Sequence, residues 1–568
     1  MKGIRIEYGS IAVGAKESFV PTASDKAEFV DIDELRTDTP ASINYGNPCD
    51  LYSVLLDGNT TPIPDDHSAY LGWWSDQISG ADGVFETPVV LTLTSDKHYS
   101  SIGFTLTFDT LNNIHATDIT IEWYDGVVKI DSADFSPDSA FYFCGKSVSG
   151  YNKAVITFRK INMPYNRLRV ASIEYGMMVT FYGDELKKCK LIQEIDPISS
   201  QIAINTCDFT IESKRNIEYP FQERQPVSVY FNDELRSTSF VTNATRKSKT
   251  SWDVKTEDYI GIMEGVAFPG GMYTDKPADD LLGEIFDTAK VPYTLPDGMN
   301  LMKMSGYIPY TTCRDALMQV AFVLGAIVDT SNSASVDLYF SKSTEAQNIP
   351  LRRIMQGQSF NEDKKVTAVE VTAHEYIPNQ EETVLYSAAD SGSGNDIFVK
   401  FSEPMHSFSI TAGSEMVEFG TNYAVINASS NCELKGKKYT HQKTVRRADL
   451  PNSETAFVEN VVGVDDATLA SPFWALKLCE RLSKHYSDTM TIKAKIVEGA
   501  HIVRFGEARY GNTAYRSVAD DPVTKVGDMV ECSTGYLGTL KGRIIKQTFS
   551  LNGNSVVKDS LIQKTITE

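Results

Sequence analysis

At 568 residues the chain is long enough for about four domains, and its 42% hydrophobic content can support several cores. The formal net charge of −21 argues against a surface that grips nucleic acid, because phosphate binding needs a basic face. No apolar run approaches the roughly 18 residues of a membrane helix, and the N-terminus does not resemble a signal peptide, so no membrane insertion is expected.

Residues 1–48 are predicted to hold one strand and then an irregular acidic segment. The tetrad Ile-Glu-Tyr-Gly occurs at residues 6–9 and again at 173–176. Four residues can match by chance and do not establish a repeat. Their positions nevertheless bracket the next domain, as two neighbouring strands separated by an insertion would.

Residues 49–172 are predicted to be almost entirely strand. Segments such as 102–108 alternate apolar and polar side chains with period two, which places Phe104 and Leu106 on one face. Helical periodicity is missing throughout this segment. The pattern predicts a β-sandwich of the jelly-roll type.

Residues 173–267 are predicted to form a first small β-barrel, in which the segment 225–262 supplies three successive short strands. A segment with the same pattern follows residue 525 and ends at Asn552-Gly553, a strong hairpin signal. Residues 471–568 are therefore predicted to be a helix followed by a second barrel.

Between the barrels, residues 268–386 are predicted to be an α+β domain and residues 387–470 a strand-rich domain. One helix should follow Pro277, and another should begin after Thr312 and stop at Gly325, because apolar residues recur at helical spacing between these signals. The expected fold class is mainly β and multidomain, with two small barrels flanking an α+β middle.

The segment 49–172 resembles discoidin and carbohydrate-binding modules in its strand succession and in the Gly72-Trp73-Trp74-Ser75 entry. Sugar-binding sandwiches of this kind use exposed aromatic faces as stacking platforms. The resemblance implies a candidate glycan-stacking site at Trp73, Trp74, Trp123 and Tyr124. Core packing is the alternative for these aromatic side chains. Trp123 and Tyr124 face opposite sides of one strand, so one of them is expected outside.

Several ordered segments resemble the baseplate hub, or tail-hub, proteins of long-tailed bacteriophages. These segments span 225–240, 251–263, 307–331, 366–378 and 525–553. The resemblance implies a homotrimer at the distal end of the tail tube, in which two barrels per chain let a three-fold ring match a six-fold tube. The implied partners are the tail tube, distal tail proteins and tail-tip or fibre proteins. DNA would pass through the ring without being specifically bound, favoured by an acidic lining. The implied location is the virion tail, assembled in the host cytoplasm. The jelly roll at 49–172 departs from a plain hub.

No catalytic, cofactor or metal site is predicted. The eight histidines show no local metal spacing, and Walker A and GxSxG sequences are missing. The eight cysteines form no CxxC pair and predict free thiols in a reducing compartment. Calcium could bind in the jelly roll, although no ligand run supports it. The leading hypothesis is therefore a structural, non-enzymatic hub. The alternative is a tail adhesin that binds a host surface glycan through the jelly roll, and a weaker one is a wall-degrading enzyme.

Overall fold

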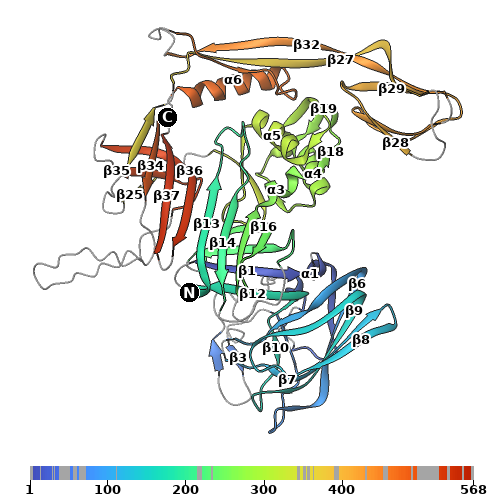
Figure 1. The fold of residues 1–568 in the computed structure, drawn as a ribbon, viewed down its shortest axis with the longest axis vertical. Helices are drawn as coiled ribbons and strands as arrows, with labels where there is room; N and C mark the ends of the chain where they lie inside the picture. The colour runs from blue at the N-terminus through green and yellow to red at the C-terminus, as the bar shows by residue number, and fades with distance from the viewer. Residues whose placement is uncertain are drawn as a thin grey trace, which may run out of the picture. The chain divides into compact units, whose positions relative to one another are not determined.

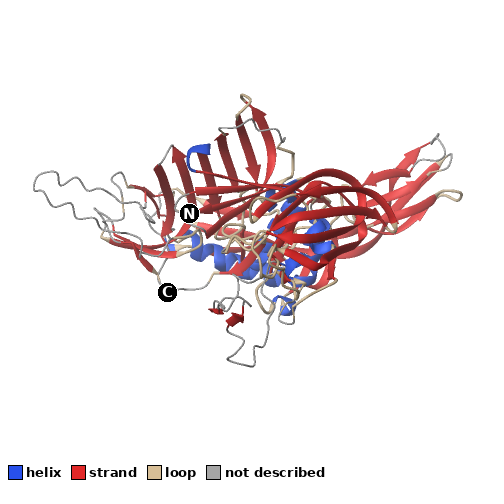
Figure 2. Ribbon diagram, turned by 90° about the horizontal axis from the view of Figure 1, so that it is seen from below, coloured by secondary structure: helices blue, strands red, loops and turns tan. Residues whose placement is uncertain are grey.

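The chain divides into two compact units, unit 1 (Met1–Ile6, Phe181–Tyr219 and Ser228–Glu568) and unit 2 (Glu7–Thr180 and Pro220–Val227). Strands predominate in both units, which confirms the mainly β, multidomain class (Figures 1 and 2). The finer domain boundaries stay predictions. The computed structural model describes residues 4–12, 14–27, 30, 32–37, 52–54, 60–62, 72–110, 112–213, 221–231, 234–341, 346–349, 354, 358–362, 364–388, 396–428, 431–451, 458–487, 490–495, 524–533, 538–552 and 555–564.

Unit 2 is built on a six-stranded antiparallel sheet in the order β11-β6-β9-β7-β8, with β2 also pairing with β6. Two short ladders, β5 with β10 and β3 with β4, accompany it. The bounds are α1 Ala15–Ser18, β2 Val20–Ala23, α2 Glu34–Thr37, β3 Tyr52–Val54, β4 Thr60–Pro62, β5 Trp73–Trp74, β6 Val84–Thr107, β7 Ala116–Asp125, β8 Val128–Phe135, β9 Phe141–Ile161, β10 Arg169–Val170 and β11 Ser172–Glu174.

The two longest strands of unit 2, β6 and β9, bend at their middle. Their register shifts between Thr94 and Gly103, and such bulges let a strand turn and continue in a new direction. Phe104, beyond the bend, therefore packs 5.7 Å from the Trp123 ring of β7. Segments predicted as separate strands are thus two halves of one strand. A two-sheet jelly roll stays a prediction.

The strand that holds the first Ile-Glu-Tyr-Gly tetrad pairs with the strand that begins at the last residue of the second. Residues 6–9 belong to β1 (Ile4–Ile11), and residues 173–176 lead from β11 into β12 (Gly176–Tyr182), which pairs with β1. Gly176 has φ of 152°, and a Cβ there would lie 2.0 Å from the carbonyl oxygen of Ser10. The close approach of the two strands therefore requires glycine at this position.

The main sheet of unit 1 joins the two segments that were predicted to be separate barrels. Its strands follow the order β15-β16-β17-β14-β13-β36-β37-β34-β26, and β35 pairs with both β36 and β25. The bounds are η3 Gly183–Glu185, β13 Leu186–Glu194, β14 Thr206–Glu212, β15 Pro226–Phe231, β16 Glu234–Arg246, β17 Ser251–Glu257, β25 Gln347–Ile349, β26 Ser359–Glu362, β34 Met490–Lys495, β35 Met529–Ser533, β36 Thr539–Asn552 and β37 Ser555–Lys564.

This arrangement corrects the prediction of two separate barrels. Within the described residues the sheet does not close on itself, because β13 pairs along its second edge with β36 instead of with its own module. An edge strand leaves a row of backbone N–H and C=O groups unpaired. Direct pairing of β13 with β36 satisfies those backbone groups on the facing edges of both strands at once.

The middle of unit 1 packs its helices around one apolar core, and the three longest, α4, α5 and α6, were predicted. The Thr312 hydroxyl accepts the backbone N–H of Asp315 at 3.1 Å, and Gly325 ends α5 with φ of 83°. Among the helices that the structure describes, none is long and apolar enough to span a membrane. The bounds are α3 Tyr259–Glu264, β18 Ala267–Phe268, β19 Gly271–Pro277, α4 Ala278–Ala289, β20 Tyr293–Thr294, η4 Met299–Leu301, β21 Lys303–Ile308, β22 Thr311–Thr312, α5 Cys313–Leu324, β23 Ala326–Asp329, β24 Val336–Phe340, β33 Val461–Val464 and α6 Pro472–Tyr486.

A long antiparallel pair, here called the arm, extends from this middle part. The arm consists of β27 (Ala368–Ala388) and β32 (Cys432–Asp449), and α6 packs against both strands. A second small sheet, here called the tip sheet, follows the order β28-β31-β30. The remaining bounds are β28 Asp396–Lys400, β29 Met405–Ile410, β30 Glu415–Phe419 and β31 Tyr423–Asn427.

Candidate functional site

Two of the predicted glycan-stacking residues, Trp73 and Trp74, lie in the core of unit 2. They form β5, in which Trp73 pairs with Val170 and Trp74 with Arg169 of β10. Trp73 is 0% exposed, and its indole N–H donates to the Asp25 carbonyl at 3.0 Å. Trp74 is also buried, with the Arg169 guanidinium 5.6 Å from its ring. A stacking platform needs an open ring face, which neither side chain offers in this structure.

The other two predicted residues, Trp123 and Tyr124, face opposite sides of β7. Trp123 is 0% exposed in the core, whereas Tyr124 is half-buried. The Tyr124 hydroxyl donates to Glu122 at 2.9 Å, and the Lys153 ammonium lies 5.1 Å from its ring centroid. The hydrogen bond from Lys129 and then that from Tyr124 lower the pKa of Glu122. Of the four predicted aromatic residues, Tyr124 therefore retains the most accessible ring.

Two histidines that are far apart in the sequence meet on the arm. His374 Nδ1 lies 2.8 Å from His441 Nε2, and the Tyr376 ring stacks on His441 with centroids 4.4 Å apart. Burial lowers the pKa of both histidines. Sequence spacing could not reveal this pair, because the register of two long strands brings it together. In the described part of the chain no group of three or more His, Cys, Asp or Glu is arranged to hold a metal. His67, His501 and Cys49 lie outside the described residues.

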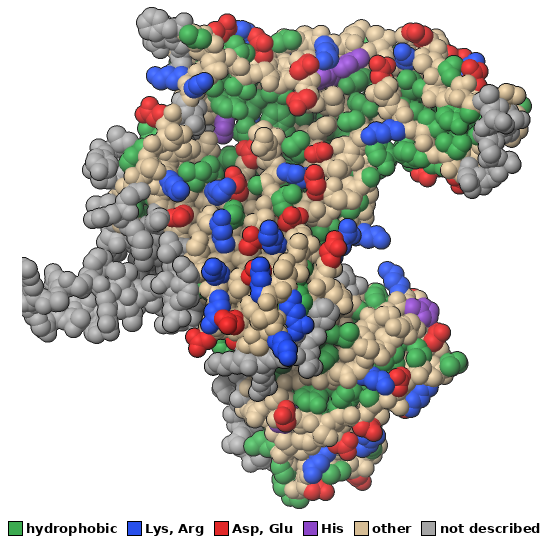
Figure 3. All heavy atoms as spheres, in the orientation of Figure 1, with side chains coloured by type: hydrophobic (Ala, Val, Ile, Leu, Met, Phe, Trp, Pro, Cys, Tyr) green, Lys and Arg blue, Asp and Glu red, His purple; other side chains and the backbone are tan. Residues whose placement is uncertain are grey.

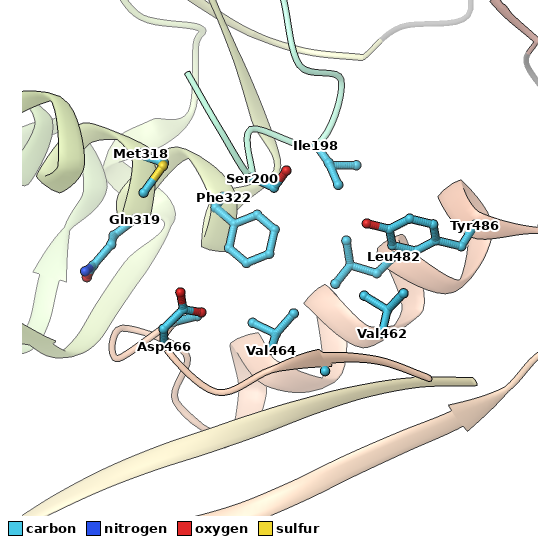
Figure 4. A pocket seen from close by; sticks show the side chains of 12 residues that line it. Ile198, Ser200, Met318, Gln319, Phe322, Val462, Val464, Asp466, Leu482 and Tyr486 are labelled. Atoms are coloured by element: carbon cyan, nitrogen blue, oxygen red, sulfur yellow. The ribbon is translucent and has the colours of Figure 1, made fainter. Parts of the chain in front are cut away.

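A pocket of about 280 Å³ lies in unit 1 between α5, α6 and β33 (Figure 4). Its walls are mostly apolar and include Phe322, Val464 and Leu482. Among its described lining residues Asp466 is the one carboxylate, and histidine and cysteine are missing. Ser200 and Tyr486 add hydroxyl groups to the lining.

The junction of β13 and β36 is the feature most directly related to the predicted hub. Residues 188–194 of β13 pair without a register shift with residues 552–546 of β36. The Lys546 ammonium lies 2.5 Å from a Glu194 carboxylate oxygen across this junction. The result is a continuous sheet with β16-β17-β14-β13 on one side of the junction and β36-β37-β34-β26 on the other.

One face of this sheet is buried, and the other carries lysines interleaved with carboxylates. Cys189 and Leu191 of β13 point into the core, while Lys188 and Lys190 alternate with them and are exposed. Lysine and arginine side chains gather over β13 and β14 (Figure 3). Across β14 and β17 the row of Lys190 continues with Asp208 and Lys255, and the row of Lys188 continues with Thr210 and Asp253. This mixed-charge face was not predicted, because strand register assembles it from distant segments.

A buried carboxylate, Asp258, fixes the link between the sheet and the helical core. Its Oδ1 accepts the backbone N–H groups of Ile260 at 3.1 Å and Gly261 at 3.4 Å, which caps α3. The Thr330 hydroxyl donates to its other oxygen. Burial raises the pKa of Asp258 to about 6, against the lowering effect of these hydrogen bonds. Its contacts are those of a structural cap.

No protein-family model and no curated protein matches the chain. Several solved structures are similar to part of it. The tail protein from Neisseria meningitidis MC58 is 11% identical with a TM-score of 0.41, over 67% of this chain and 92% of that chain. The prophage MuSo2 43 kDa tail protein from Shewanella oneidensis is 7% identical with a TM-score of 0.41, over 68% and 95%. The prophage tail protein gp18 from Listeria monocytogenes EGD-e is 11% identical with a TM-score of 0.38, over 69% and 92%.

Proposed function

We propose that the chain is a structural tail protein, the trimeric hub that joins a six-fold tail tube to a three-fold tip. The observation that carries this proposal is the β13–β36 junction, which places two antiparallel β modules side by side in one chain. Three such chains in a ring would present six modules. A three-fold assembly can in this way match a six-fold partner without a second gene product.

The sequence resemblance to tail-hub proteins supports the same class, and three of its segments, 225–240, 251–263 and 525–553, include strands that the sheet unites. The solved structures compared above are described as tail proteins. The protein would act by binding and symmetry matching, break no covalent bond, and reside in the virion tail after assembly in the host cytoplasm.

The exposed lysines of this face bear on which surface meets which partner. Lysines that line a channel would attract the phosphate backbone of passing DNA. We therefore assign the face with Lys188, Lys190 and Lys255 to contact with neighbouring tail proteins, including the tail tube and distal tail proteins. DNA would pass through the ring along other surfaces without specific binding. Tail-tip or fibre proteins would attach at the distal side.

The test is the mass of the full chain in solution by light scattering, followed by negative-stain imaging. The expected result is three times the monomer mass and a ring with a central channel. A monomer at every concentration, both alone and with purified tail-tube protein, would overturn the hub. The double variant Lys188→Glu/Lys190→Glu tests the assignment of this face, with Lys477→Glu on α6 as the control. The double variant should reduce binding to the tube protein while leaving the free trimer intact, and the control should change neither.

Glycan binding by unit 2 is the second candidate. It would require open ring faces, and three of the four predicted aromatic side chains are buried. Tyr124 is the one position at which this alternative can be tested directly, by the effect of Tyr124→Ala on binding to a glycan array.

A further inference from the structure

The tip sheet of unit 1 presents an outward face that the hub function does not use. Alternate residues of its strands point into a small core, among them Val399, Ala424 and Ile426. The intervening residues therefore point the opposite way. The tip sheet, in which β28 is an edge strand, lies beside β29 at the far end of the arm (Figure 1).

The register of the three strands determines what stands on this outward face. Phe398 of β28 is opposite Val425 of β31, which is in turn opposite Glu418 of β30. In the next row Lys400 is opposite Tyr423. The row on the other side aligns Asp396, Asn427 and Glu415 in the same order of strands.

Two aromatic rings at the centre of this face stack on each other and are here called the platform. Phe398 is 50% exposed, and its ring stacks on Tyr423 with centroids 5.6 Å apart and an interplanar angle of 22°. Tyr310, which precedes β22, stands edge-on to both rings at 5.6 Å and 6.1 Å. The Lys400 ammonium lies 4.8 Å from the Tyr310 centroid. Each ring is held by the others, so the platform is ordered before any ligand arrives.

Hydrogen-bonding groups border the platform on two sides. The Tyr423 hydroxyl donates to the Glu418 carboxylate, which fixes that carboxylate beside the ring. The Asn427 amide lies within 3.5 Å of the Asp396 carboxylate. Carboxylates accept hydrogen bonds from hydroxyl groups, and an amide can both donate and accept.

We propose that this platform, formed by Phe398 and Tyr423 with Glu418 and Asp396 beside them, binds a neutral pyranose unit of a surface polysaccharide. A pyranose combines an apolar C–H face, which packs on aromatic rings, with hydroxyl groups around its edge, which suit the bordering carboxylates and amide. The carboxylates disfavour a polyanionic glycan or nucleic acid by like-charge repulsion.

The experiment uses the full chain on an array of neutral oligosaccharides, namely cellohexaose, maltohexaose and chitohexaose, with poly(glycerol phosphate) as the polyanionic comparison. Phe398→Ala removes half of the platform, and Tyr423→Phe keeps the ring but removes the hydroxyl beside Glu418. The matched control is Phe419→Ala, a side chain of similar exposure (58%) on the same sheet that packs on Phe408 instead. The melting temperature of each variant reports whether the tip sheet still folds.

The expected result is binding of at least one neutral oligosaccharide. Its affinity should fall about tenfold in Phe398→Ala, the size seen when a central aromatic contact is truncated. Tyr423→Phe should reduce it less, and Phe419→Ala should leave it unchanged. Binding to none of the neutral sugars, binding only to poly(glycerol phosphate), or equal loss in Phe419→Ala would overturn the proposal. The inference does not depend on the trimer: if Phe398→Ala changed the mass of the assembly and left sugar binding intact, this face would be a protein interface.

Discussion

Replacing Asp258 with asparagine should make the stability of the protein less dependent on pH. The side chain is 0% exposed, and its burial raises its pKa to about 6. In the unfolded chain an aspartate titrates near 4. The folded state therefore binds this proton more tightly than the unfolded state. The stability that protonated Asp258 contributes is complete below about pH 4 and is lost as the pH rises through about 6.

The size of the effect follows from the two pKa values. A difference of about two units corresponds to about 3 kcal/mol between the low-pH and high-pH limits. The asparagine side chain of the Asp258→Asn variant would resemble the protonated acid, since asparagine also caps helices well. Its amide oxygen can keep the bonds from Ile260 and Gly261, while its NH₂ group can donate to the Thr330 hydroxyl.

The assay is urea unfolding of wild type and Asp258→Asn at several pH values between about 4 and 8, followed by intrinsic fluorescence. The free energy of unfolding of wild type should fall relative to that of the variant by about 3 kcal/mol across this window. Other carboxylates titrate in both proteins and cancel in the comparison. Curves that remain parallel over the whole range would show that Asp258 does not carry this proton and would refute the reasoning.

Three further predictions concern unit 2. Gly103→Ala should destabilise unit 2 by at least about 2 kcal/mol, because a Cβ would lie 2.2 Å from the Cys144 carbonyl oxygen and φ at Gly103 is 144°. Thermal unfolding measures this loss, and an unchanged melting temperature would contradict the bend of β6 and β9. Trp123→Ala should lower the free energy of unfolding by about 3 to 5 kcal/mol because it leaves a core cavity, whereas Tyr124→Ala on the other face of β7 should lower it by about 1 kcal/mol or less. Equal losses in denaturant unfolding would show that the two faces of β7 are assigned incorrectly. Burial raises the pKa of the Cys144 thiol to about 12, so this thiol should resist a thiol-specific reagent in the native protein and react on unfolding; rapid native labelling at this position would disprove its burial.

Local patterns predicted the helices accurately because the signals for a helix lie within a few residues. Pro277 immediately precedes α4, and the Thr312 cap and the Gly325 stop define α5 as expected. The candidate site was less predictable. A tryptophan side chain packs in a core as readily as it binds a sugar. The alternation of side chains along β7 shows only that Trp123 and Tyr124 lie on opposite faces of the strand. Which side is buried depends on elements elsewhere in the chain.

The sequence by itself determined the strand-rich composition and the positions of the three main helices. Both depend on residue periodicity or on short-range capping. Tertiary structure alone decided that β13 pairs with β36, that His374 meets His441, and that Phe398 and Tyr423 form an open platform. Each depends on the register between strands that are distant in sequence. The register is set by which whole faces of the strands are buried, and no single residue in the sequence indicates that choice.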